Sequence, residues 1–460
     1  MAQYGCGTAY LPFSLIDAYW AHSPVVAINS DTDSRTRYLE EYQEVDQLPL
    51  LQSCTKWRGG LPAPERIADV LRTAIRAAVS GSPGPVYLGI PMDWYTRELA
   101  PEPELYADSG FSRVPAHRAA PLAVDIDRAV EALVGAKRPL ILAGGGVLLS
   151  GAWEELSALA EALSVPVVTS VSGKGSISEL HPLSLGVGGR YSRKVANDAL
   201  DECDLCLAVG TRLGSLGTDT FKSPPAGTPI VHIDFDPLTL GRAYREAVSI
   251  AADARIALEL LIDAAGQAGL PGRPPRWEDW TRAMQGRLGA WRRSLAEQSA
   301  IEMADGRLNP FFVLGQLNAY LEEDDVLVAD TGYMSAWSAT VIDQKNAGRN
   351  TLRAAGSLGW AFPAGFGARL AAGEDRRVVV LTGDGGLGYH LADLETALRL
   401  GLRTTTVVLN NSAFGFSYDV QRYLHAQAER LPEATDFLDI DFGAVATAFG
   451  AHGETVRDPE

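Results

Sequence analysis

The sequence contains little cysteine, and this excludes one class of protein. Four cysteines in 460 residues cannot form a disulfide framework, which needs many paired cysteines in a short chain. Cys203 and Cys206 form a CxxC motif, but no second pair exists to complete a zinc site. The motif runs into the apolar segment 205–209, so we interpret both thiols as core residues, with redox or metal use as the alternative.

Positive charge is also scarce, and long apolar runs are absent. Lys and Arg number 40 against 57 Asp and Glu, which gives a net charge of −17. A field of this sign attracts neither nucleic-acid phosphates nor an anionic membrane surface. No apolar run is long enough to span a bilayer, and no Lys or Arg precedes Arg35 to form the basic region that a signal peptide requires. We therefore expect a soluble, cytoplasmic protein without a nucleic-acid or membrane partner.

What the sequence does contain is an alternation of secondary-structure patterns. Short β-branched runs alternate with amphipathic helical stretches, which is typical of parallel sheets covered by helices. The pattern predicts three α/β blocks, 1–102, 122–265 and 300–460. The segment 99–121, rich in Pro, Ala and acidic residues, and the Gly- and Pro-rich segment 266–275 are the predicted linkers between them.

The first two blocks have recognisable elements. The first contains predicted strands 24–29 and 86–90 and a predicted helix 65–79. The second contains predicted strands 139–143, 165–169, 205–209 and 229–234, with a helix 152–163. Gly144, Gly145 and Gly146 follow the first of these strands. However, Leu149 stands where a GxGxxG motif needs its last glycine, so a dinucleotide site is only weakly indicated.

A helix after the second linker carries large apolar side chains at three- and four-residue spacing. This spacing predicts one continuous packing face. A binding site made of tryptophans is the alternative interpretation. The residues are Trp277, Trp280, Met284, Leu288 and Trp291.

The third block carries a pair of polar motifs separated by one strand-helix-strand unit. A predicted strand 378–382 leads into Gly383-Asp384-Gly385-Gly386; a helix 389–400 and a strand 404–409 lead to Asn410-Asn411. A right-handed crossover places both motifs at the carboxyl edge of one parallel sheet. Glycines let the backbone approach a diphosphate, and carboxylate and carboxamide oxygens suit Mg²⁺. The pair predicts a magnesium–diphosphate site, with two unrelated turns as the alternative.

Together these motifs resemble the thiamine diphosphate-dependent enzymes of the acetohydroxyacid synthase and pyruvate oxidase type, over essentially the whole chain. The resemblance implies three consecutive parallel-sheet, Rossmann-like domains, the first and last of them incomplete. It implies Mg²⁺ ligands at Asp384, Asn411 and the carbonyl of Ala413. The diphosphate contacts implied in the same way are Gly383, Gly385, Gly386 and the amide of Phe414.

Two further segments of the third block resemble cofactor-lining parts of this family. Gly356-Ser357-Leu358-Gly359 is similar to the segment under the aminopyrimidine ring, with Leu358 as the wedge that bends the cofactor. A glycine-rich packing helix is the alternative for this region. Asp330-Thr331-Gly332-Tyr333-Met334 is similar to another cofactor-lining turn, which implies contacts from Gly332 and Tyr333.

The first block resembles the pyrimidine-binding domain of the same family. Residues 42–46 are similar to the family's Phe-Gln-Glu segment, and residues 53–57 are similar to a stretch with an active-site lysine. The resemblance therefore implies catalytic roles for Gln43 and Lys56 beside Leu358. Polar residues of a solvated loop are the alternative interpretation of Gln43 and Lys56.

The second block matches places where flavin-containing relatives hold FAD, at residues 210–214 and 232–237. The family's Phe-Asp-Asp-Arg run after the arginine is absent here. FAD is therefore possible but not favoured, and a vestigial nucleotide fold is the preferred interpretation.

The resemblance also implies an activity. A pyruvate-like 2-oxo acid is decarboxylated and its remaining unit is joined to a second carbonyl, as in acetolactate formation, by a homodimer or homotetramer. In synthases Asn-Asn is followed by Gly-Met and a tryptophan that selects the acceptor. Here Phe416 replaces the methionine and Val420 stands at the tryptophan position. A simple 2-oxo acid decarboxylase or a carboligase with another acceptor therefore stay open.

The family's activating glutamate lies upstream of a turn that resembles Gly5-Cys6-Gly7, and the chain begins just before this turn. Relative to the family the sequence is thus expected to be truncated at both ends. A fragment or mis-called gene is the first explanation. A split enzyme with a separate subunit that supplies the glutamate is the second, and a non-catalytic cofactor-binding relative is the third.

Overall fold

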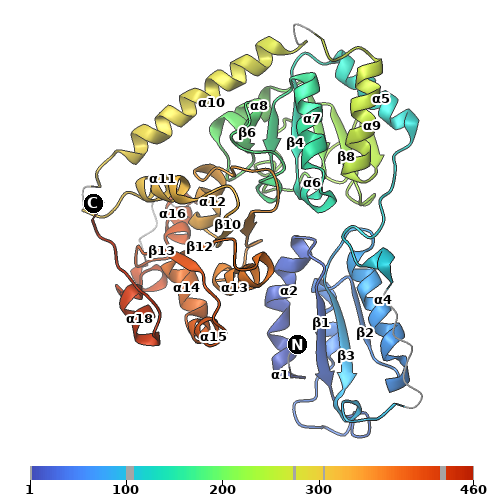
Figure 1. Ribbon diagram of the computed structural model, residues 1–460, viewed down its shortest axis with the longest axis vertical. Helices are drawn as coiled ribbons and strands as arrows, with labels where there is room; N and C mark the ends of the chain where they lie inside the picture. The colour runs from blue at the N-terminus through green and yellow to red at the C-terminus, as the bar shows by residue number, and fades with distance from the viewer. Residues whose placement is uncertain (1–2, 100–107, 273–275, 304–305, 425–430, 459–460) are drawn as a thin grey trace. The chain divides into compact units, whose positions relative to one another are not determined.

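A computed structural model describes residues 3–99, 108–272, 276–303, 306–424 and 431–458. It divides into two compact units, Met1–Ala120 and Pro121–Glu460, which are described separately (Figure 1). The described strands form three sheets of three, six and four strands, and every strand pairing is parallel. The predicted α/β class with three parallel sheets is confirmed. No described helix has the length and apolar character needed to cross a membrane.

The first unit contains a sheet of order β1-β3-β2, with β1 at Val26–Asp31, β2 at Trp57–Gly60 and β3 at Val86–Pro91. The predicted strand 24–29 begins two residues too early, and only alternate residues of β1 are buried. The predicted helix 65–79 begins as a 3₁₀ turn, and its α-helical part is α4, Ile67–Val79. A second helix, α2 (Leu11–Trp20), precedes β1.

The six-stranded sheet of the second unit has the order β6-β5-β4-β7-β8-β9. Helices α5 (Ala123–Gly135), α7 (Trp153–Leu163) and α9 (Ala254–Gln267) pack on one face, and α8 (Lys194–Glu202) and α10 (Glu278–Ser299) on the other. The inner strands alternate side chains between these two layers, as a doubly covered sheet requires. The strands are β4 (Pro139–Ala143), β5 (Val167–Thr169), β6 (Ser184–Val187), β7 (Leu205–Val209), β8 (Ile230–Asp234) and β9 (Val248–Ala251).

Three sequence-based expectations for this region need correction. A short helix, α6 (Gly145–Ser150), begins directly after β4 and was missed because glycine has a low helix propensity. The edge strands β6 and β9 were also missed; they are four residues each. The predicted linker 266–275 begins too early, because α9 continues to Gln267. Residues 273–275 of this linker, and residues 100–107 of the first, lie outside the described residues.

The tryptophan-bearing helix α10 confirms the packing interpretation. The indole N–H groups of Trp277 and Trp280 donate to the carbonyls of Ala136 and Pro139, each at 3.0 Å. Met284 is fully buried against the six-stranded sheet. The core interpretation of the CxxC motif is confirmed as well, because Cys203 and Cys206 are buried free thiols and burial raises the pKa of each.

The four-stranded sheet has the order β11-β10-β12-β13. Helices α11 (Pro310–Tyr320) and α12 (Tyr333–Thr340) pack on one face and α13 (Ala361–Ala372) on the other. The strands are β10 (Val326–Ala329), β11 (Thr351–Arg353), β12 (Val378–Gly383) and β13 (Thr405–Leu409). The chain then continues through α16 (Gly415–Leu424), α17 (Pro432–Thr435) and α18 (Phe442–Phe449).

The predicted helix 389–400 is wrong at its start. The structure has two helices here, α14 (Asp384–His390) and α15 (Asp393–Arg399), so the helix begins five residues earlier, directly after β12. Asp384 occupies the first turn, where a carboxylate is favourable. The three glycines of α14 weaken the helical pattern in the sequence, and this explains why the earlier start was missed.

Candidate functional site

The polar motifs of the third block gather at one edge of the four-stranded sheet. Strands β10, β12 and β13 are parallel neighbours, with Ala329 paired to Leu381 and Gly383 paired to Leu409. The residues that follow these strands therefore leave the sheet at the same edge. This edge holds Asp330, Asp384 and Asn411, in the arrangement that the crossover rule predicted.

The three predicted metal ligands come from two neighbouring turns, Asp384 from the turn after β12 and Asn411 and Ala413 from the turn after β13. The amide of Ala413 donates to Asp384 Oδ2 at 3.0 Å and to Asn411 Oδ1 at 3.3 Å. Burial raises the pKa of Asp384, while hydrogen bonds from backbone amides oppose that rise. A carboxylate, a carboxamide and a carbonyl form the hard-oxygen donor set that Mg²⁺ takes. Among the described residues, no group of three or more His, Cys, Asp or Glu side chains could hold a metal.

The glycines of the predicted diphosphate turn are required by packing. A Cβ atom at Gly385 would lie 2.7 Å from Phe414 Cε1, and one at Gly386 would lie 2.6 Å from Asp330 Oδ2. The Phe414 amide, predicted to contact the diphosphate, donates instead to the carbonyl of Thr435 at 2.8 Å. A diphosphate contact from Phe414 would have to replace this bond.

Asp330 is the site residue to which the sequence analysis assigned no role of its own. Its carboxylate is fully buried and accepts hydrogen bonds from the amides of Thr331 and Gly359 and from the Thr382 hydroxyl. Burial raises its pKa, and these hydrogen bonds act in the opposite direction. The available signal was its position, since Asp330 is the first residue after β10. Leu358, the predicted wedge, directly precedes Gly359.

Tyr333 joins two helices beside this edge. Gly332 has a φ of 70° and precedes α12, which Tyr333 begins. The Tyr333 hydroxyl donates to the Asp419 carboxylate on α16. Its ring stacks on Trp337, with ring centres 4.7 Å apart, and meets the edge of Phe416 at 5.4 Å. Phe416 thus packs its ring against Tyr333 on the side of α16.

The predicted substrate residues belong to the first unit. Gln43 is half-buried with a φ of 62°, and its side chain accepts a hydrogen bond from Gln3 Nε2 at 3.1 Å. The Lys56 ammonium is exposed and donates to the carbonyl of Ser80, beyond the end of α4. Both assignments stay predictions.

The carboxyl edge of the six-stranded sheet holds the places matched to FAD sites. His232 has Nδ1 2.5 Å from Glu246 Oε1 and Nε2 2.7 Å from the carbonyl oxygen of Thr211. A Cβ atom at Gly144 would lie 2.2 Å from the carbonyl oxygen of Gly210, and one at Gly146 would lie 2.6 Å from Gly210 Cα. The glycine turns after β4 and β7 are therefore packed directly on each other.

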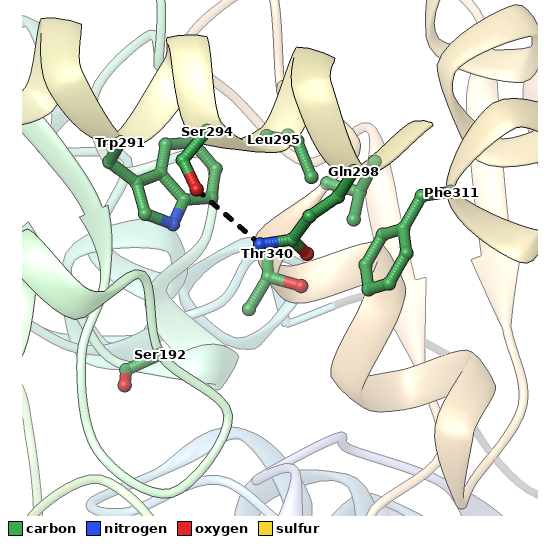
Figure 2. A pocket seen from close by; sticks show the side chains of 8 residues that line it. Ser192, Trp291, Ser294, Leu295, Gln298, Phe311 and Thr340 are labelled. Carbon is green, nitrogen blue, oxygen red and sulfur yellow. Dashed lines mark hydrogen bonds between the residues drawn. The ribbon is translucent and has the colours of Figure 1, made fainter. Parts of the chain in front are cut away.

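A cavity of about 210 Å³ lies elsewhere, among α10, α11, α12 and the loop before α8. Figure 2 shows Ser294 and Gln298 of α10 turned toward each other, and their side chains are 3.4 Å apart. Trp291 of α10 lines this cavity, but none of the predicted metal, cofactor or catalytic residues does. The candidate site consequently rests on the edge of the four-stranded sheet.

Comparison with known proteins gives two family matches within the second unit. Residues 126–261 match the family described as "Thiamine pyrophosphate enzyme, central domain", and residues 330–460 match "Thiamine pyrophosphate enzyme, C-terminal TPP binding domain". A probable acetolactate synthase large subunit of Methanocaldococcus jannaschii is 29% identical over 99% of this chain and 76% of its own length.

Two other relatives extend the comparison. The acetolactate synthase large subunit of Corynebacterium glutamicum is 30% identical over 96% of this chain and 70% of its own length. The sulfoacetaldehyde acetyltransferase of Alcaligenes xylosoxydans xylosoxydans is 30% identical over 99% of this chain and 77% of its own length. The similarity thus reaches proteins with different named activities.

Proposed function

The chain belongs to the thiamine pyrophosphate enzymes, transferases and lyases dependent on that cofactor, and we propose that it decarboxylates a pyruvate-like 2-oxo acid and joins the remaining unit to a second carbonyl compound. The observation that carries this proposal is the convergence of Asp384 and Asn411 on the amide of Ala413. The turns after β12 and β13 together supply a carboxylate, a carboxamide and a carbonyl oxygen at the edge where parallel α/β sheets bind ligands.

The residues present fit thiamine diphosphate with Mg²⁺. Asp384, Asn411 and the carbonyl of Ala413 would hold the metal, and the turn from Gly383 to Gly386 would hold the diphosphate. This turn has no room for a Cβ atom at Gly385 or Gly386, so only bare backbone is presented there. When bound, the cofactor supplies a nucleophilic carbon that also stabilises the negative charge left by loss of CO₂.

The chain's own residues have the remaining roles. Leu358, in the turn held by Asp330, would set the conformation of the thiamine group, and Gly332 and Tyr333 would line it. The ring of Phe416 would limit the size of the acceptor. In the first unit, the Lys56 ammonium can pair with the carboxylate of a 2-oxo acid, and the Gln43 amide can donate to its carbonyl oxygen.

An activity assay tests this proposal. The purified chain is incubated with thiamine diphosphate, Mg²⁺ and pyruvate, and both CO₂ and acetolactate are measured. We expect both products at a rate typical of enzymes, on the order of 1 per second or more. CO₂ without acetolactate would refute the synthase assignment, and cofactor binding without any turnover would refute catalysis by this chain alone.

A carboligase with a different acceptor is the second candidate. Phe416 and Val420 stand at the positions where the synthases carry a methionine and a tryptophan, and one relative of 30% identity is named a sulfoacetaldehyde acetyltransferase. Competition between pyruvate, other 2-oxo acids and aldehydes as acceptors distinguishes the candidates. A clear preference for an acceptor other than pyruvate would replace the acetolactate assignment.

The assembly is part of the proposal as well. We propose a cytoplasmic homodimer or homotetramer. Several relatives are named as large subunits, so association with a second, different chain is also proposed. Light scattering of the purified chain, with and without cofactor, measures the size of the homo-oligomer. Copurification from the native source tests the association with a different chain.

A further inference from the structure

Three segments at the edge of the four-stranded sheet meet at one carboxylate, that of Asp330. Oδ1 accepts a hydrogen bond from the Thr331 amide at 2.7 Å, and the Gly359 amide is shared between Oδ1 and Oδ2 at 3.0 and 3.1 Å. Oδ2 also accepts from the Thr382 hydroxyl at 2.9 Å. The partners come from the turn after β10, the turn before α13 and the end of β12.

Close backbone packing joins the same segments. Gly359 has a φ of 88°, and a Cβ atom there would lie 2.8 Å from the carbonyl oxygen of Gly386. A Cβ atom at Gly386 would in turn lie 2.6 Å from Asp330 Oδ2. The turn 356–359 and the turn 383–386 are therefore packed closely against each other and against Asp330.

A carboxylate suits this position for a chemical reason. Every partner identified above is an N–H or O–H donor, and an ionised carboxyl group only accepts. Burial of a charge is tolerated when hydrogen bonds of this kind compensate the lost hydration. Asp330 is fully buried, so its carboxylate accepts hydrogen bonds from neighbouring protein groups and not from solvent.

We propose that Asp330 is a positioning residue that fixes the turn 356–359 against the turn 383–386, so that both ends of thiamine diphosphate are bound at once. This inference rests on the proposed function, which places the diphosphate at 383–386 and the thiamine group at 356–359. Asp330 would act through Gly359 and Gly386, without belonging to the metal ligands.

Calorimetry on the full chain distinguishes the contributions of the two turns to ligand binding. Mg²⁺–pyrophosphate fills only the turn 383–386, whereas Mg²⁺–thiamine diphosphate requires both turns. In Asp330→Asn an amide NH₂ group faces donors, so one hydrogen bond is lost. We expect affinity for thiamine diphosphate to fall roughly 10-fold, and affinity for pyrophosphate to stay within about 2-fold.

Asp325→Asn is the matched control. Asp325 is a buried carboxylate at the opposite end of β10 and pairs with Arg377. This variant should lose stability and keep the ratio of the two affinities. Thr382→Val, which removes a single donor to Asp330, repeats the test if Asp330→Asn does not fold, with a smaller expected loss of about 3-fold.

Hydrogen exchange in the absence of ligand gives an independent readout. Asp330→Asn should accelerate exchange of the Gly359 amide at least roughly 10-fold, while amides in the middle of α13 stay unchanged. Equal losses for both ligands, or unchanged binding and exchange, would overturn the inference. A wild-type chain that binds neither ligand would overturn the proposed function instead, so the two failures are distinguishable.

Discussion

The two sheets of the second unit share a parallel α/β construction but use their carboxyl edges differently. In the six-stranded sheet the turns after β4 and β7 lie on each other, because Gly144 and Gly146 contact the backbone of Gly210. In the four-stranded sheet the glycine turn after β12 contacts the side chains of Asp330 and Phe414 as well as the backbone of Gly359. The first edge is closed by packing of two glycine turns on each other, and the second brings polar side chains from neighbouring turns together.

The comparison shows that a glycine run after a parallel strand has two possible uses. It can permit backbone-to-backbone contact, or it can present a bare backbone to a ligand. Gly144-Gly145-Gly146 and Gly383-Asp384-Gly385-Gly386 look similar in the sequence. The difference lies in the turn at the end of the neighbouring strand, which is Asn410-Asn411 after β13 and a further glycine turn after β7.

The largest expected effect concerns the metal ligand. Asp384→Asn keeps the size of the side chain and removes its charge, so Mg²⁺ affinity measured by titration with bound thiamine diphosphate should fall roughly 100-fold, which is about 2.7 kcal/mol. Asp234→Asn, at the end of β8 in the other sheet, is the control and should leave this affinity unchanged. An equal loss in both variants would remove the proposed difference between the edges.

The next effect contrasts two glycines. Gly386→Ala and Gly146→Ala each introduce a Cβ atom 2.6 Å from a neighbouring atom, and each should cost about 1–3 kcal/mol of stability through overpacking. Only Gly386→Ala should also weaken cofactor binding. Thermal unfolding and calorimetry measure both effects, and Gly388→Ala, with open space around it, serves as the control. Weakened binding in Gly146→Ala would contradict the closed-edge description.

A smaller effect depends on pH. Burial is the largest cause that raises the pKa of Asp234 from 3.8 to about 6. Because the folded pKa lies above the unfolded value, the stabilisation from protonated Asp234 is present below pH 4 and is lost as pH rises through 6. Asp234→Asn avoids this loss and keeps an acceptor for the Asp236 amide. It should gain about 1 kcal/mol at pH 7.5 and nothing below pH 4, as measured by denaturant unfolding.

The smallest expected effect is an unchanged melting temperature when FAD is added. Since the carboxyl edge of the six-stranded sheet is occupied by its own glycine turns, added FAD should not raise the melting temperature. Thiamine diphosphate with Mg²⁺ should raise it, by linkage to the folded state. A flavin absorbance band in the purified protein, or a clear stabilisation by FAD, would contradict this and show that the protein binds a flavin.

Several features of the site could be predicted from the sequence. The placement of Asp384 and Asn411 at one edge followed from the strand-helix-strand pattern between them, because crossover handedness is nearly invariant. The start of α14 at Asp384 could not be predicted, since three glycines within seven residues hide a helix whose position is set by packing. Asp330 was noticed within a cofactor-like turn, but its hydrogen bonds to Gly359 and Thr382 cross 29 and 52 positions.

The sequence by itself determined the alternation of strands and helices, the family and the edge at which the polar motifs meet. These depend on local periodicity, on motif spacing and on a handedness rule that holds for every chain of L-amino acids. Only the tertiary structure decided which glycine turn packs on another glycine turn and which packs on the side chains of the site, and that Asp330 joins two turns of the site. Such contacts depend on packing between distant segments, and no pattern of neighbouring residues records them.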